Sequence, residues 1–237
     1  MKLFIGTSGW SYKHWQGIFY PRKLTQNKWL NYYSKHFNTV ELNMSFYRFP
    51  SIEIIDKWQK ELPEEFKMTL KANRMITHVK RFKNVDRILA DFYALAEGFK
   101  NNLGCILFQA PPFFKYSDEN VEIMANFLKI LDKEKRNAVE FRHLSWWNQK
   151  VYELFQKEEI GFCSVSGLNM PEDAITTSKF AYIRFHGPDE AYSSKYSEEE
   201  LKEWAKKINS LKTKEIFCYF NNDQNAYAVE NAKELRK

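Results

Sequence analysis

Cysteine, proline and glycine are scarce in this chain of 237 residues, which contains three, seven and eight of them respectively. The cysteines are Cys105, Cys163 and Cys218, and each lies inside an apolar stretch with no partner at metal-binding spacing. An odd number of isolated cysteines, without a signal-peptide pattern in residues 1–20, predicts reduced, buried thiols in a cytoplasmic protein. A disulfide-stapled secreted scaffold is therefore excluded.

Long apolar runs and flexible linkers are also missing. No stretch approaches the ~20 apolar residues of a membrane-spanning helix, so no membrane association is predicted. No linker rich in proline, glycine or serine interrupts the chain, so residues 1–237 are predicted to form a single domain. The motifs GxGxxG, GxxxxGKS/T, HxH and HExxH do not occur, which argues against the common nucleotide-binding folds and zinc hydrolases.

Apolar, aromatic and charged residues are abundant, at 44%, 17% and 28% of the chain. This balance is typical of a globular protein. The net charge of +6 and the isoelectric point of about 9.0 are compatible with an anionic ligand, and nucleic acid is one alternative. Lysine and arginine are nevertheless spread over the predicted helices, as on an ordinary solvated surface.

One short stretch, Ala138–His143, shows the pattern that recurs through the chain. Val139 and Phe141 share one phase of a predicted strand, whereas Glu140 and Arg142 share the other. Because side chains alternate faces along a strand, one face is apolar and the other is charged. Similar segments end in polar residues at 39–43, 67–71, 107–109, 182–186 and 218–223.

Amphipathic helical segments separate these strands. They are predicted at residues 28–37, 52–62, 85–99, 117–131, 149–157, 197–210 and 226–235, and none is predicted at 168–179. Eight strands alternating with helices in about 30-residue units predict an α/β fold, a TIM-like (β/α)₈ barrel with parallel strands. A doubly wound open sheet is the alternative. The long aromatic loop around Trp15 and Tyr20 is typical of a lid.

If the barrel closes, the polar strand ends meet at one mouth, where this architecture places its ligand site. The predicted site comprises Glu41, Asn43, Lys71, Gln109, Glu140, Arg142, Arg184, His186, Asn221 and Asp223. Trp10, Tyr47 and Trp146 are predicted to contact a ligand by stacking, with core packing as the alternative for the tryptophans.

Within this set, Lys71, Arg142, Arg184 and His186 form a cationic group suited to a phosphate or carboxylate. Glu41 and Glu140 are the predicted general acid/base pair, with Lys71 and His186 as further catalytic candidates. A structural role for His186 is an equal alternative. No metal is predicted, because nearby cations would repel a dication, and no motif assigns a cofactor or an oligomeric state.

Several motifs together resemble one family over essentially the whole chain. They are GTSGWSY (6–12), WQGIFYP (15–21), TVELN (39–43), SFY (45–47), ITH (76–78), QAPP (109–112), VEFRH (139–143), RFHG (184–187) and FNND (220–223). In this order they resemble the YecE-like family, also called domain of unknown function 72. The resemblance implies a TIM-like barrel with the motif residues at one end, and implies no particular activity, substrate or cofactor.

Three hypotheses about function follow from the sequence. The first is an enzyme performing acid/base chemistry, hydrolysis or isomerisation, on a small anionic substrate that bears a phosphate or carboxylate. The second is a barrel that binds or processes nucleic acid, suggested by the basic charge and the aromatic residues. The third is a non-catalytic binder of a small ligand.

Overall fold

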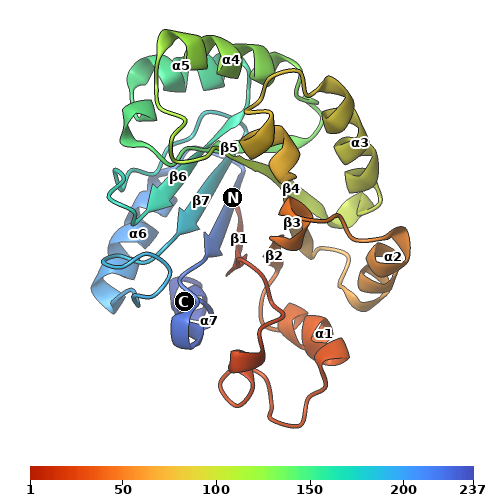
Figure 1. Cartoon of the computed structure of the whole chain (residues 1–237). Coiled ribbons are helices and arrows are strands. Elements are labelled where there is room, and N and C mark those ends of the chain that lie inside the picture. The colour runs from red at the N-terminus through yellow and green to blue at the C-terminus, as the bar shows by residue number, and fades with distance from the viewer.

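A computed structural model describes all 237 residues, and in it eight parallel strands form a nearly closed barrel surrounded by helices (Figure 1). The strands are β1 (Lys2–Thr7), β2 (Thr39–Leu42), β3 (Lys67–Lys71), β4 (Leu103–Gln109), β5 (Arg136–Glu140), β6 (Gly161–Ser166), β7 (Phe180–Phe185) and β8 (Glu215–Phe220). Their order in the sheet is β1-β8-β7-β6-β5-β4-β3-β2. Because β1 pairs with β8, the predicted barrel is confirmed and the open doubly wound sheet is excluded.

The helices are α1 (Trp29–Ser34), α2 (Ile52–Glu61), α3 (Asp86–Glu97), α4 (Asp118–Lys129), α5 (Gln149–Lys157), α6 (Glu198–Ser210) and α7 (Tyr227–Leu235). No helix connects β6 to β7, as the sequence predicts. A capping box begins α6, because the Ser197 hydroxyl accepts from the Glu200 N–H while the Glu200 carboxylate accepts from the Ser197 N–H. None of these helices has the length and apolar character needed to cross a membrane.

The seam between β1 and β2 is held mainly by side chains. A single backbone bridge joins Ser8 to Glu41. Below it, the Asn38 amide accepts from one β1 backbone N–H at 3.1 Å and donates to a β1 carbonyl at 2.8 Å. The Tyr33 hydroxyl accepts from the Thr7 N–H at 2.9 Å. These bonds satisfy backbone groups that a regular ladder would otherwise pair, and so they complete the barrel.

Two apolar layers lie on the two faces of the strands, as the alternating pattern predicts. Inside the barrel, Phe4 stacks on Phe217 at 4.6 Å, and Tyr182 contacts Tyr219. Outside, residues of the opposite phase pack under the helices and form the larger core. Cys105 and Cys163 belong to the inner layer and Cys218 to the outer one, and all three are buried free thiols.

The aromatic loop between β1 and α1 is packed into the core, so its interpretation as a lid is wrong. Trp15 and Tyr20 are buried, and the Tyr20 ring stacks on Trp29 at 4.8 Å. The Tyr20 hydroxyl also donates to the Trp10 carbonyl at 2.6 Å. Stacked, hydrogen-bonded aromatic rings tie this loop to α1, as in a packed core segment.

Candidate functional site

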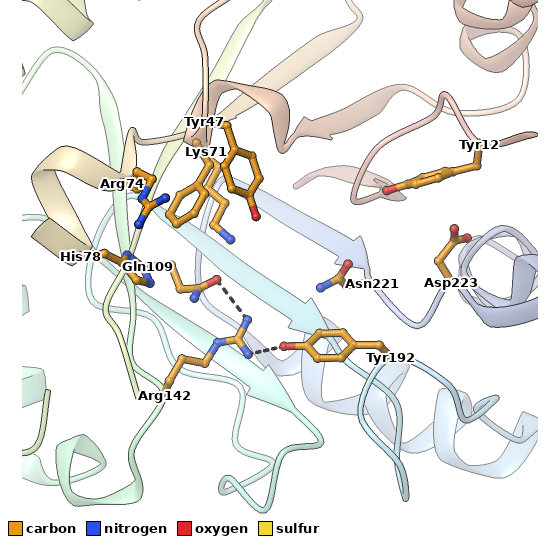
Figure 2. Close-up of a pocket in the computed structure, with 11 residues that line it drawn as sticks. Tyr12, Tyr47, Lys71, Arg74, His78, Gln109, Arg142, Tyr192, Asn221 and Asp223 are labelled. Atoms are coloured by element: carbon orange, nitrogen blue, oxygen red, sulfur yellow. Dashed lines mark hydrogen bonds between the residues drawn. The ribbon is translucent and has the colours of Figure 1, made fainter. Parts of the chain in front are cut away.

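A cavity of about 640 Å³ lies at the carboxyl-terminal ends of the strands (Figure 2). Lys71 and Gln109 end β3 and β4, and the other lining residues lie in the loops after the strands. Six residues of the predicted site line it: Tyr47, Lys71, Gln109, Arg142, Asn221 and Asp223. The barrel therefore brings residues from β3, β4 and the loops after β2, β5 and β8 to one place.

Five further lining residues were not among the predicted site residues: Tyr12, Phe46, Arg74, His78 and Tyr192. Arg74 and His78 lie in the segment after β3, where Met75–Val79 forms one turn of π-helix. Such turns are rare and often occur at functional sites. Strand parity does not predict where side chains in loops lie. In the sequence, only the ITH motif at 76–78 indicated that this segment could belong to the site.

Positive charge dominates the cavity wall. Lys71, Arg74 and Arg142 line it together with His78, whereas Asp223 is its only carboxylate. Burial and the Lys71 charge lower the pKa of His78, which favours its neutral form. The cavity therefore suits an anionic group.

Lys71, like Arg74, lines the cavity without an ion-pair partner. Its ammonium lies 4.6 Å from the centroid of the Phe46 ring and forms no ion pair. Figure 2 shows the amine pointing into the cavity. Burial, reinforced by the positive charge of Arg184, lowers the pKa of Lys71 to about 8. Such an amine exchanges a proton near neutral pH.

Arg142 is held in one orientation beside the cavity. Its Nε lies 2.6 Å from Glu140 Oε1. Its Nη1 donates to the Tyr192 hydroxyl at 2.7 Å, and its Nη2 donates to Gln109 Oε1 at 3.1 Å (Figure 2). A guanidinium has five N–H groups, so those not used in these contacts remain for an anion. The fixed geometry lowers the entropic cost of binding such a ligand.

A buried ionic layer lies beneath the cavity and contains four of the predicted site residues: Glu41, Glu140, Arg184 and His186. Arg184 Nη2 donates to Glu41 Oε1 and Nη1 donates to Glu140 Oε2, each at 2.6 Å. Ser8 and Tyr182 also donate to Glu41, again at 2.6 Å. At most 1% of the side chain of Glu41, Glu140 or Arg184 is exposed. Partners surround the side chains of Glu41, Glu140 and Arg184, and none of these three residues lines the cavity. They therefore form an electrostatic foundation beneath the cavity rather than contacts to a ligand.

His186 completes this layer on the Glu140 side. Burial would by itself raise the pKa of Glu140, but Arg142 and Arg184 hold it well below its usual range. Burial and the Arg142 charge lower the pKa of His186 to about 3, so the imidazole is neutral. His186 Nε2 then donates to Glu140 Oε1 at 3.0 Å, and Nδ1 accepts from the Asn221 amide at 3.2 Å. His186 thus positions Asn221 at the cavity wall.

Asp223 lies across the cavity from Lys71 (Figure 2). Its Oδ1 accepts from Trp15 Nε1 at 2.8 Å, and its Oδ2 is 3.0 Å from His14 Nε2. Burial raises the pKa of Asp223 to about 6, although both neighbours favour the carboxylate. Near pH 7 this group is an anion able to accept a proton.

The remaining predicted residues lie away from the main cavity. Trp10 and Asn43 line a neighbouring cavity of about 350 Å³. Trp146 is fully buried, with its ring stacked on Phe141 at 4.1 Å and its Nε1 donating to the Phe114 carbonyl at 2.7 Å. No group of three or more His, Cys, Asp or Glu side chains is arranged to hold a metal ion.

Comparisons with known proteins agree with this architecture. The family model described as "Protein of unknown function DUF72" matches residues 4–237. The chain is 31% identical to the UPF0759 protein YunF of Bacillus subtilis, over 98% of this chain and 93% of that protein. It is 26% identical to the UPF0759 protein YecE of Escherichia coli K12, over 60% of this chain and 48% of that protein.

Solved structures show the same relationship. A DUF72 family protein (TM1631) from Thermotoga maritima superposes with a TM-score of 0.91 at 33% identity, covering 100% of this chain and 98% of that chain. A DUF72 family protein (EF0366) from Enterococcus faecalis gives a TM-score of 0.84 at 20% identity, over 99% and 94% of the chains. SacUVDE shares the fold alone, with a TM-score of 0.54 and 9% identity.

Proposed function

The chain belongs to the DUF72 family, and from the geometry of its mouth we propose that it is an enzyme performing acid/base chemistry on a small anionic substrate. The observation that carries this proposal is the unpaired Lys71 amine, which lies among cationic groups and across the cavity from Asp223. A phosphate or carboxylate of the substrate binds Arg142 and Arg74, as their charge and donor geometry favour.

The two titrating groups support an assignment of roles. The pKa of Asp223 is about 6 and that of Lys71 about 8, so near pH 7 the first is a base and the second an acid. Asp223 accepts a proton from the bound substrate, and Lys71 polarises the reacting bond from the opposite side. Glu41 and Glu140, the pair favoured by the sequence, support the floor of the site in this proposal.

This assignment predicts a bell-shaped pH profile. Activity rises as Asp223 loses its proton near pH 6 and falls as Lys71 loses its proton near pH 8. We would follow phosphorylated and carboxylated metabolites by NMR in the presence of the wild-type protein, Lys71→Met and Asp223→Asn. Each substitution should lower the turnover number by about 10²- to 10⁴-fold.

Lys67→Met is the matched control, because Lys67 occupies the opposite end of β3 and donates there to the Asn101 carbonyl. It should leave turnover unchanged. Unaltered turnover in Lys71→Met would contradict the proposal. So would the absence of both turnover and measurable binding of inorganic phosphate or a carboxylate.

A second candidate function is binding of single-stranded nucleic acid at the rim of the mouth. Tyr47 lines the cavity and is 73% exposed, and Phe113, in the loop after β4, is 58% exposed with the Arg81 guanidinium 5.0 Å from its ring centroid. Exposed aromatic rings beside arginine can stack on bases, and the net charge of +6 attracts phosphates. Binding of short oligonucleotides should weaken steeply with salt and with Tyr47→Ala. Salt-independent or absent binding would reject this candidate.

A further inference from the structure

We infer that Lys71 acts covalently, by condensing with the carbonyl carbon of an anionic aldehyde or ketone to form an imine. This inference rests on the anion site and the Asp223 base of the proposed function, and it narrows the substrate class to carbonyl compounds that carry a phosphate or carboxylate. Lys71 then acts first as the neutral amine and afterwards as the cationic imine, in place of the acid assigned above, so the fall in activity above pH 8 would be absent. It begins from the position of the amine, which ends β3 and points into the cavity without an ion-pair partner (Figure 2).

A lysine amine attacks a carbonyl only in its neutral form, and most lysines in proteins are protonated at neutral pH. Lys71 differs because it is largely buried beside Phe46 and shares the cavity with Arg74 and Arg142. Its pKa of about 8 leaves roughly a quarter of the amine neutral at pH 7.5. An ordinary lysine with a pKa near 10.4 is neutral in about one molecule per thousand. The difference in the reactive fraction is on the order of 100-fold.

The surroundings of Lys71 fit the rest of such a reaction. Arg142, oriented by Glu140, Gln109 and Tyr192, can hold the anionic group of the substrate next to the amine. Asp223 lies across the cavity, where a carboxylate can remove the proton on the carbon beside the imine. A cationic imine polarises that carbon more strongly than a hydrogen bond does, which gives Lys71 its electrophilic role.

The balanced step is simple. The nitrogen lone pair of the neutral amine attacks the carbonyl carbon, and a carbinolamine forms after proton transfer from nitrogen to oxygen. The carbon–oxygen bond then breaks, and the oxygen leaves as water after taking up one proton. The product is a protonated imine between Lys71 and the substrate, formed without an oxidant, a reductant or a metal. Hydrolysis by water reverses the step and releases the product.

Reductive trapping tests this inference on the wild-type protein, so it does not depend on the folding of a variant. The protein is incubated at pH 7.5 with pyruvate or dihydroxyacetone phosphate and sodium cyanoborohydride, and the labelled lysines are located by peptide mass mapping. We expect labelling of Lys71 to exceed that of any exposed lysine by at least about tenfold. This ratio is set below the difference in neutral fraction, which is on the order of 100-fold. Acetone, which lacks the anionic group, should label it weakly, and Lys67 on the same strand should stay unlabelled.

Competition separates this inference from the proposed function. The rate of Lys71 acetylation is measured with and without inorganic phosphate, which cannot form an imine. If phosphate protects Lys71 but neither carbonyl probe labels it, the imine is rejected while anion binding at the mouth stands. If Lys71 is neither protected nor labelled, both proposals fail. Equal labelling of Lys71 and exposed lysines would also overturn the inference.

Discussion

Replacing Glu140 by glutamine should destabilise the protein strongly, because this side chain compensates two guanidinium groups in the barrel interior. The Glu140 carboxylate lies 2.6 Å from Arg184 Nη1 and 2.6 Å from Arg142 Nε, and its side chain is fully buried. Glutamine has nearly the same shape, so Glu140→Gln removes charge and leaves little cavity. Arg184 would keep Glu41 as a partner, but the layer would lose one of its two negative charges.

Removing one member of a buried ion pair costs about 3–5 kcal/mol of folding free energy, because the remaining charge is left poorly compensated. For a chain of this size, 1 kcal/mol corresponds to about 2–4 °C in the melting temperature. The expected decrease is therefore roughly 6–20 °C. Urea denaturation followed by tryptophan fluorescence gives the free-energy difference directly.

The destabilisation caused by Glu140→Gln should depend on pH. Since the pKa of Glu140 is held well below its unfolded value, its stabilising contribution is present above about pH 4.3 and is lost as the pH falls through the folded pKa. The deficit of Glu140→Gln should thus be full at pH 7 and should shrink below pH 4. Glutamine cannot ionise, whereas the wild-type carboxyl takes up a proton in the unfolded state below about pH 4.3 and in the folded state only at lower pH.

Glu198→Gln is the matched control, because Glu198 forms an exposed ion pair with Lys202 at 2.7 Å on α6. It should cost under about 0.5 kcal/mol. If Glu140→Gln cost less than about 1 kcal/mol, or if its deficit did not change with pH, the buried layer would not be the electrostatic foundation described above.

Three further predictions concern the site, the core and the seam. Lys71→Met should stabilise the protein at pH 7 by on the order of 2 kcal/mol, because the lowered pKa of Lys71 reflects the cost of burying its charge. Chemical denaturation should show that this increase in the free energy of unfolding shrinks between pH 8 and 10.4, where the wild-type amine becomes neutral in the folded state. Trp146→Ala should cost about 3–5 kcal/mol in urea denaturation yet leave phosphate affinity of the folded protein unchanged, and a changed affinity would mean that this ring contacts the ligand. Tyr33→Phe should cost about 1–3 kcal/mol by the same measurement, because the Thr7 N–H at the barrel seam loses its partner, and a neutral result would mean that the seam closes without it.

The local sequence was sufficient to predict the helices and strands and the face on which each strand side chain lies. Alternating residues such as Val139 and Glu140 point to opposite faces because the strand period is two, whatever surrounds the strand. The Ser197 capping box likewise marks its helix start through bonds within four residues. Hence the barrel and the set of inward-facing polar residues could be predicted from the sequence.

Strand parity predicts the face on which a side chain lies but not its depth along the barrel axis. Only the tertiary structure decided that depth. Glu41, Lys71 and Arg184 all face inward, but the register of neighbouring strands puts Glu41 opposite Thr69, two residues before Lys71. Glu41 and Arg184 therefore meet beneath the floor, while Lys71 reaches the cavity. The same holds for Trp146, whose burial against Phe141 depends on a fold that brings distant residues together. Which charges neutralise one another and which stay free for a ligand is a property of strand register and packing, because it depends on distances between segments that are remote in the chain.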